Sequence, residues 1–216
     1  MKTEKLIQAL AEEAKPVITI FSPARQLIVW LVLTVLFFSG VIALFGTRPD
    51  FHQKLSEMHY LTEMVLAIIT AVTAAMAAIW FSLPDMGQKP WVRWMPLLSL
   101  IIWVLYLMFS MDQTMPQAVK MLTAECHHAR YDCAWHLALF ALIPGALLFM
   151  MMRKAAAVHY YWAGGMAALA VASIGYLCLR ILEENDSITH LLLWHVIPMF
   201  ILSILGVFIG RVTLRW

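Results

Sequence analysis

Long apolar runs alternate with short polar segments along most of the chain. The runs cover residues 27–46, 61–83, 91–110, 133–152, 160–182 and 188–210. A run of about 18 or more mostly apolar residues is long enough to cross a bilayer as a helix. Within lipid a helix satisfies its own backbone hydrogen bonds, whereas an open strand does not. The sequence therefore predicts an all-α polytopic membrane protein with six transmembrane helices.

Residues 3–14 have a different, amphipathic pattern and predict one short N-terminal helix. Its apolar face consists of Leu6, Ile7, Leu10 and Ala14, and Pro16 follows its end. A helix this short is marginal alone in water, so its apolar face needs a surface. Membrane-surface helices are usually rich in lysine and arginine, but this one carries Glu12 and Glu13. The pattern favours a protein surface over lipid, with a disordered leader as the alternative.

Composition and charge agree with a membrane protein. Apolar residues make up 62% of the chain and charged residues 13%. The net charge is +2 and no basic block is present, so the sequence does not indicate nucleic-acid binding. It also identifies no small-molecule substrate. The first 24 residues contain no apolar core, so we expect no cleavable signal peptide.

Orientation follows from the distribution of lysine and arginine in the connecting segments, which are richer in these residues on the cytoplasmic side. With the N-terminus inside, the cytoplasmic set is Lys2, Lys5, Lys15, Arg25, Lys89, Arg93, Arg153, Lys154, Arg211 and Arg215. The outer set is Arg48, Lys54, Lys120, Arg130 and Arg180. We therefore expect both termini in the cytoplasm and the protein in a bacterial inner membrane. Residues 1–24 form a partner-binding segment, residues 25–216 the transmembrane domain, and residues 111–132 its longest periplasmic loop.

Two of the three cysteines lie close together at the start of the fourth predicted helix. Cys126 and Cys133 precede or begin that helix, and Cys178 lies near the end of the fifth, toward the same side. In an oxidising compartment Cys133 could pair with Cys178, or with Cys126. The alternative is that the cysteines are buried and inert. These three residues are the candidate redox-sensing positions.

Several imidazole and carboxylate side chains fall on the same outer side and suit zinc or copper. Cys133 and His136 can share a helix face, as can His59 and Glu63, and His190 begins the sixth span as His136 begins the fourth. The candidate metal ligands are His127, His128, His136, His59, Glu63 and His190. The alternative is a set of interfacial histidines bonded to water and lipid head groups. Apart from such an ion, no cofactor is expected.

Other function classes have weaker support. No nucleophile–base pair, phosphate-binding loop or pair of catalytic carboxylates can be picked out, so we do not expect an enzyme. The centres of the predicted helices are almost free of ionisable residues, which counts against an ion-coupled transporter. A membrane oxidoreductase or electron carrier with haem or quinone held by histidines is the main alternative. A metal-ion transporter is a weaker one.

Three stretches of the chain together resemble a known family. At the N-terminus, Leu6–Val17 is followed by Pro23-Ala-Arg25. At the fourth predicted span, Cys133 is followed by Pro144 eleven residues later and by Arg153-Lys154 at the helix end. The C-terminal part carries Asp186-Ser187, Leu193-Trp194-His195, Gly206, Gly210-Arg211 and Arg215-Trp216. These stretches are similar to the leader, the fourth span and the C-terminal end of the NrsF-like family of bacterial six-helix membrane anti-sigma factors.

The resemblance implies that the chain holds an extracytoplasmic-function sigma factor at the cytoplasmic face and releases it on a periplasmic redox or metal signal. The residues expected to bind the sigma factor are Leu6, Ile7, Leu10, Glu12, Glu13, Pro16 and Val17. The family carries two periplasmic cysteines associated with the stress response. Cys133 occupies the first position, but Glu183 stands where the second is expected and Cys178 lies five residues earlier. This departure implies either a metal signal or a different disulfide that uses Cys126.

Overall fold

The computed structural model describes residues 3–13, 21–83, 90–110, 131–155 and 157–215, and these segments contain helices and no strands. The long helices are α2 (Pro23–Phe45), α4 (Met58–Phe81), α5 (Trp94–Phe109), α7 (Tyr131–Arg153), α8 (Tyr160–Leu182) and α10 (Ile197–Thr213). The shorter elements are α1 (Thr3–Glu12), α3 (Phe51–Lys54), a 3-10 turn at Pro90–Arg93, α9 (Ile188–Leu191) and a π-helical turn at Leu192–Val196.

The six predicted membrane spans are confirmed. Six helices are long and apolar enough to cross a membrane, and α9, the π-helical turn and α10 together make the last of them, Ile188–Thr213. The fifth span was predicted with the bounds that the structure gives, and the others differ by up to four residues at an end. The predicted N-terminal helix is also present, as α1. Helix ends fray, so boundary differences of this size carry no further meaning.

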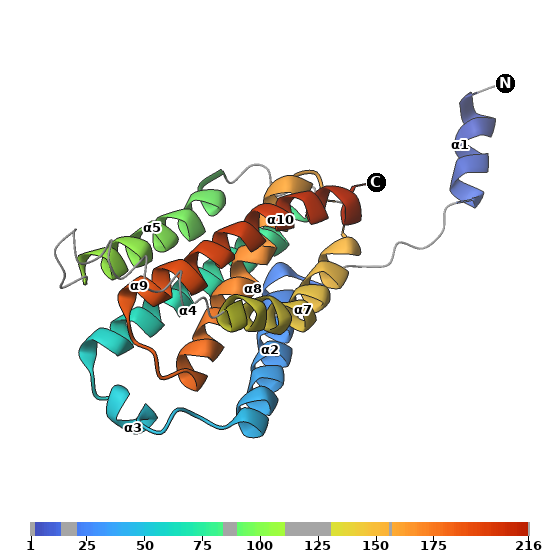
Figure 1. Ribbon diagram of the computed structural model, residues 1–216. Coiled ribbons are helices and arrows are strands. Elements are labelled where there is room, and N and C mark those ends of the chain that lie inside the picture. Colours follow the sequence, from blue (N-terminus) through green and yellow to red (C-terminus); the bar gives the residue numbers. More distant parts are fainter. Residues whose placement is uncertain (1–2, 14–20, 84–89, 111–130, 156, 216) are drawn as a thin grey trace.

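Helix α8 occupies the centre of the bundle (Figure 1). It packs against α4, α7 and α10, while α5 packs against α4, and α2 against both α4 and α7. Helix α4 packs most extensively against α8, and it buries a series of alanines, among them Ala67, Ala71, Ala74 and Ala78. Small side chains let helix backbones approach closely, which is how helices gain packing energy in lipid. The buried alanines of α4 therefore suit its close packing against α8.

Three glycines bring the backbones of α8 and α10 close together. A Cβ atom added at Gly164 would lie 2.7 Å from the Cα of Gly210, and one added at Gly206 would lie 2.6 Å from the carbonyl oxygen of Gly164. Neither backbone leaves room for a methyl group. Glycine at these positions is thus required by the close approach of the two helices.

Two prolines alter the helices in different ways. Pro144 lies inside α7, and its carbonyl oxygen accepts a hydrogen bond from the Trp30 indole of α2, at 3.0 Å. Pro198 lies at the start of α10, directly after the π-helical turn. Because proline lacks a backbone N–H, it cannot complete a regular helical ladder at this point. The π-helical turn before Pro198 changes the helical repeat and therefore the direction in which His195 points.

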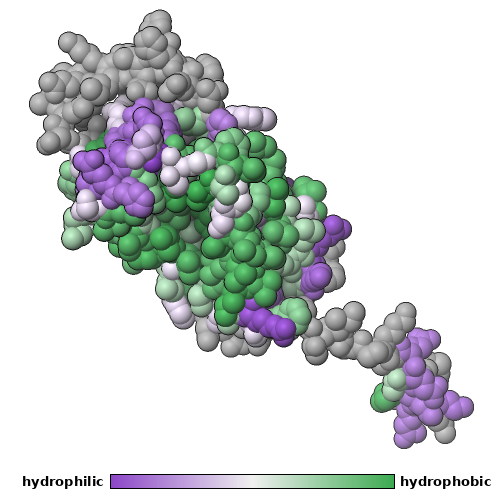
Figure 2. All heavy atoms as spheres, turned by 90° about the horizontal axis from the view of Figure 1, so that it is seen from below, coloured by the Kyte–Doolittle hydropathy of each residue, from purple (hydrophilic) through white to green (hydrophobic). Residues whose placement is uncertain are grey.

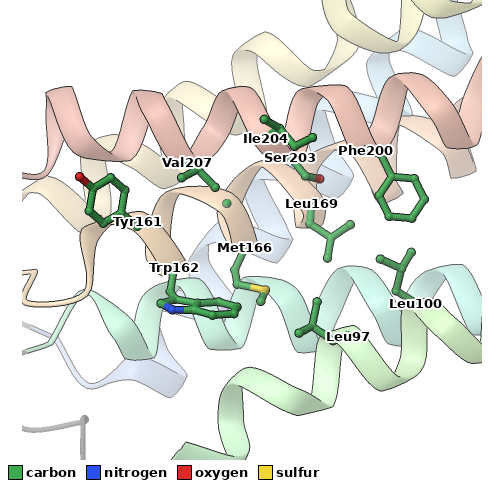
Figure 3. Close-up of a pocket in the computed structure, with 11 residues that line it drawn as sticks. Leu97, Leu100, Tyr161, Trp162, Met166, Leu169, Phe200, Ser203, Ile204 and Val207 are labelled. Carbon is green, nitrogen blue, oxygen red and sulfur yellow. The ribbon is translucent and has the colours of Figure 1, made fainter.

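The outer surface of the bundle is apolar. Figure 2 shows hydrophobic side chains over much of the bundle, with hydrophilic groups toward its two ends. Large side chains such as Leu36 of α2, Ile101 of α5 and Phe208 of α10 are more than half exposed. A cavity of about 350 Å³ lies between α5, α8 and α10, and its lining is mainly apolar, including Leu97 and Met166 (Figure 3). These surfaces suit contact with lipid rather than chemistry.

Candidate functional site at one end of the bundle

The ion pairs of the described bundle gather at one end. There the ends of α2 and α8 meet the starts of α4, α7 and α9. The backbone N–H of Arg48, after α2, bonds to the carbonyl oxygen of Ile181 at 2.9 Å. The Tyr60 hydroxyl of α4 donates to the carbonyl oxygen of Arg180 at 3.0 Å. We call this region the site end.

Four side chains form a compact group at the site end, which we call the Cys133 cluster: Cys133, Glu183, His190 and His195. Glu183 lies at its centre. Its Oε1 accepts a hydrogen bond from the Cys133 thiol at 3.2 Å and lies 3.0 Å from His190 Nε2. Its Oε2 lies 3.1 Å from His195 Nε2. One possible ligand atom from each residue lies within 4.8 Å of all the others. The cluster joins the start of α7 to the end of α8 and the last span.

The π-helical turn explains how His190 and His195 reach the same carboxylate. Residues five apart on a regular α-helix point about 140° away from each other. In the π-helical turn the Ile197 N–H bonds instead to the Leu192 carbonyl oxygen, which widens the helix by one residue. The two imidazole rings then lie with their centroids 5.4 Å apart. Both rings are fully buried.

Hydrogen bonding keeps Glu183 ionised despite its partial burial. Burial alone would raise the pKa of this carboxyl. The contacts from His190, His195 and Cys133 outweigh that effect and hold the pKa well below its usual range. Glu183 therefore supplies a fixed negative charge beside two imidazoles and a thiol.

A second group, the ion-pair network, lies beside the cluster and is centred on Asp186. The Asp186 carboxylate accepts from Arg48 at 2.8 Å, from Arg180 at 2.7 Å and from Lys54 at 3.0 Å. Arg48 also forms a bidentate ion pair with Asp50, with hydrogen bonds of 2.6 and 2.9 Å. These bonds fix the connector between α8 and α9, on which Glu183 lies. The network therefore positions the central residue of the Cys133 cluster.

The deepest part of the network is a buried charge pair between α4 and α8. Arg180 Nε lies 2.6 Å from Glu63 Oε1, and both side chains are almost inaccessible. The Tyr176 hydroxyl also donates to Glu63, and the Arg180 guanidinium lies 5.0 Å from the centroid of the Tyr60 ring. A buried ion pair of this kind contributes net stability only when its remaining polar atoms are also bonded, as they are here.

The charges of the network outside the spans are strongly coupled. Burial would raise the pKa of Asp186, but hydrogen bonds from Arg48, Arg180 and Lys54 lower it well below its usual range. The hydrogen bonds to Asp186 and Asp50 raise the pKa of Arg48, which stays charged at any accessible pH. The hydrogen bonds to Glu57 and Asp186 likewise raise the pKa of Lys54. The three basic side chains of the network, Arg48, Lys54 and Arg180, are thus neutralised by paired carboxylates.

The structure gives the predicted metal-ligand residues different partners. His190 lies in the Cys133 cluster, and His136 lines a cavity with Cys133 and Glu183. His59 and Glu63 do not act together: His59 Nδ1 bonds to the Tyr106 hydroxyl at 2.7 Å, whereas Glu63 pairs with Arg180. The His–Glu spacing on α4 places both on one helix, but neighbouring helices supply better partners for each.

The predicted redox residues are also separated. No disulfide joins Cys133 and Cys178. Cys178 is buried and lines an apolar cavity between α2, α4 and α8 with residues such as Leu31 and Ile174, whereas Cys133 bonds to Glu183. Cys126, His127 and His128 lie outside the described residues.

The proposed sigma-binding residues fall on α1 and after it. Ile7, Glu12 and Glu13 are exposed, and Ile7 has 61% of its surface accessible. Leu6 and Leu10 belong to α1, although their side chains are not described, and Pro16 and Val17 lie outside the described residues. In Figure 1 α1 stands apart from the bundle. The apolar face of α1 thus has one exposed member, Ile7.

Two residues of the Cys133 cluster, Glu183 and His195, were not among the predicted site residues. Glu183 was identified only as the position where the family has a cysteine, and His195 only as part of a C-terminal motif. Regular helical spacing places His195 away from His190, so only the π-helical turn brings them together. The sequence signal that could have indicated this turn is Pro198, three residues after His195.

The fold and the site define a class: a six-span membrane protein with a buried thiol–carboxylate–imidazole cluster at one end. Residues 10–216 match the model of a family described as negative regulator of sigma F, NrsF. Because this match covers nearly the whole chain, the chain belongs to that family. It is therefore a negative regulator of a sigma factor, and a sigma factor is its partner. No curated protein and no solved structure matches the chain.

Proposed function

We propose that this protein is an inner-membrane anti-sigma factor that sequesters an extracytoplasmic-function sigma factor at the cytoplasmic face. The family match over residues 10–216 is the observation that carries the proposal. Six apolar helices would anchor the regulator, so a bound sigma factor is kept at the membrane and away from its promoters. The family description names a regulator, which favours this role over the oxidoreductase and transporter alternatives.

The partner-binding surface is residues 3–17, with α1 as its ordered part. An exposed Ile7 on a helix of ten residues provides an apolar anchor, and exposed Glu12 and Glu13 provide negative charge. Sigma factors bind DNA, so their DNA-binding surfaces are basic. An amphipathic acidic helix suits such a surface through apolar contact and charge complementarity.

Charge distribution supports an orientation with both termini in the cytoplasm. At the site end Arg48, Lys54 and Arg180 are each paired with a carboxylate. The residues predicted to face the cytoplasm, among them Arg153 and Arg211, lie at the opposite helix ends. The net positive charge thus belongs to the end next to α1, as the positive-inside rule requires. The site end then faces the periplasm, where Cys133 is placed to respond to oxidants or metals.

Release requires that the signal favour the state without sigma factor. Cys133 begins α7 and is bonded to the end of α8, the central helix, so a change at this thiol acts on the helix that contacts most of the bundle. A shift from mostly bound to mostly released sigma factor needs a difference of about 5 kcal/mol between the two states. The free-energy change when one buried network of hydrogen bonds and ion pairs forms or is lost is of this order.

Co-purification of the sigma factor with the full-length, detergent-solubilised protein tests sequestration. Ile7→Asp puts a charge on the apolar face of α1 and is expected to abolish recovery of the sigma factor. Gln8→Asp adds the same charge about 100° further round the helix and serves as the matched control, which should retain it. Equal recovery with both variants would exclude α1 as the docking helix. No sigma factor in the wild-type preparation would overturn the proposed function.

A further inference from the structure

We infer that Cys133, Glu183, His190 and His195 form a binding site for one divalent transition-metal ion of the zinc type. Only the claim that this ion acts as a signal rests on the proposed function. The binding site itself follows from the geometry of the four side chains.

The donor set fits a tetrahedral ion in number, type and spacing. Zinc accepts thiolate, imidazole and carboxylate ligands at about 2.0–2.3 Å, which places neighbouring donor atoms about 3.3–3.8 Å apart. Here the contacts to Glu183 are 3.0 to 3.2 Å, and all four donor atoms lie within 4.8 Å of one another. Small side-chain rotations would therefore open the cluster around an ion. Sulfur and nitrogen donors favour such a metal over magnesium or calcium.

Charge balance also favours a divalent ion. Binding breaks the Sγ–H bond of Cys133, releases its proton to solvent and leaves the sulfur lone pair to bond the metal. The thiolate and the Glu183 carboxylate then carry two negative charges, and the two imidazoles bind as neutral ligands. The complex is neutral in a region where His190 and His195 are fully buried. An uncompensated charge there would be costly.

The surroundings supply both rigidity and access. The Asp186 ion pairs fix the connector that holds Glu183, and the π-helical turn fixes the relative direction of the two imidazoles. Such outer contacts orient metal ligands and strengthen binding. A cavity of about 340 Å³ lined by Cys133, His136 and Glu183 reaches the cluster, with Phe45 and Phe140 on its apolar side. His136 is placed to receive an ion on its way in.

The consequence for the bundle is a metal bridge between α7 and the last span. Without the ion, the hydrogen bond from the Cys133 thiol links α7 to Glu183. With the ion, α7 is joined to both histidines as well. Occupancy therefore changes how firmly the start of α7 is held against α8 and α9, which is the change that a signal at this end must produce.

The test is zinc and cobalt binding by the full-length protein in detergent, in a background with Cys126→Ser, His127→Gln and His128→Gln. This background removes the candidate ligands Cys126, His127 and His128 from the segment before α7. We expect one Zn²⁺ per chain, and a thiolate-to-metal absorption band when Co²⁺ is bound. Cys133→Ser should remove the band. His195→Gln should weaken Zn²⁺ binding by at least about 100-fold, because even outer contacts are typically worth 10–100-fold. Cys178→Ser and His59→Gln are the matched controls and should bind as the background does.

A second readout does not depend on the folding of the ligand variants. Bound Zn²⁺ should slow alkylation of Cys133 by a maleimide at least about 10-fold in the wild-type chain, as followed by peptide mass spectrometry, and leave Cys178 unchanged. Binding that survives both Cys133→Ser and His195→Gln, or folded protein that binds no Zn²⁺ and shows no protection, would overturn the inference. Either result leaves the co-purification of the sigma factor unaffected, so failure of the metal site and failure of sequestration are distinguished.

Discussion

The Cys133 thiol donates a hydrogen bond to Glu183, with Sγ 3.2 Å from Oε1, and so joins the first turn of α7 to the residue that follows α8. In the family that the sequence resembles, the position of Glu183 is where a second cysteine is expected. The two positions are therefore in contact in this chain, although one of them carries a carboxylate. This contact makes Cys133, rather than Cys178, the thiol that is coupled to the polar end of the bundle.

The first prediction concerns the two described cysteines. Cys133→Ser should reduce induction of a sigma-dependent reporter by oxidants or metal salts to the uninduced level, because serine cannot supply a thiolate. Cys178→Ser should leave induction unchanged, since Cys178 lines an apolar cavity. Reporter activity in cells expressing each variant at equal levels is the measurement. Normal induction with Cys133→Ser would remove the thiol from the mechanism and leave sequestration intact.

The second prediction concerns the buried pair of Glu63 and Arg180. Loss of one partner leaves the other charge buried and unpaired, so Glu63→Gln or Arg180→Met should each lower the free energy of unfolding by about 3–5 kcal/mol. The double variant should cost less than the sum of the two, because neither charge remains. Unfolding in mixed micelles measures all three. Additive effects would show that the two side chains do not stabilise each other.

The third prediction concerns acid. The pKa values of Asp186 and Glu183 are lower in the folded protein than the usual unfolded values of about 3.9 and 4.3. Their contribution to stability is thus fully present above about pH 4 to 5 and is lost as the pH falls toward the folded pKa values. The melting temperature should therefore decrease as the pH is lowered below about 4. Asp186→Asn should melt lower at neutral pH and lose less on acidification. An equal acid slope in both proteins would contradict the role given to Asp186.

The fourth prediction concerns the contact between α8 and α10. Gly206→Ala should destabilise the bundle by at least about 1–3 kcal/mol, because the added methyl group meets Ala168 and the Gly164 backbone. Gly40→Ala in α2 is the matched control, since nothing lies within 4 Å of a Cβ atom there. It should be neutral or stabilising by up to about 1 kcal/mol, as alanine is the better helix former. Equal melting temperatures for the two variants would argue against close glycine packing.

The spans could be predicted from the sequence because they depend on local hydropathy. Runs of apolar residues fix where helices form in lipid, and the observed spans follow the predicted ones closely. The alanine and glycine contacts could also be predicted, because small residues spaced four apart share one helix face. The N-terminal helix was predicted from the same kind of periodicity.

The site could be predicted only in part, because it depends on contacts between distant segments. Cys133 and His190 were identified, but the pairing of Glu63 with Arg180 joins positions 117 residues apart, and helical spacing had suggested His59 as its partner. His195 was missed as a member of the cluster because the π-helical turn breaks the regular repeat. Glu183 was noted as a departure from the family pattern, and only the fold shows that it lies against Cys133.

The central claim is that the docking helix and the Cys133 cluster lie on opposite sides of the membrane. Single cysteines at Ala11 and Ser56, both exposed positions, report the two sides in a chain whose Cys126, Cys133 and Cys178 are replaced by serine. Spheroplasts treated with a membrane-impermeant maleimide should label Ser56→Cys directly and Ala11→Cys only after permeabilisation. Labelling of both positions from the same side would contradict the account, because no signal would then have to cross the bilayer.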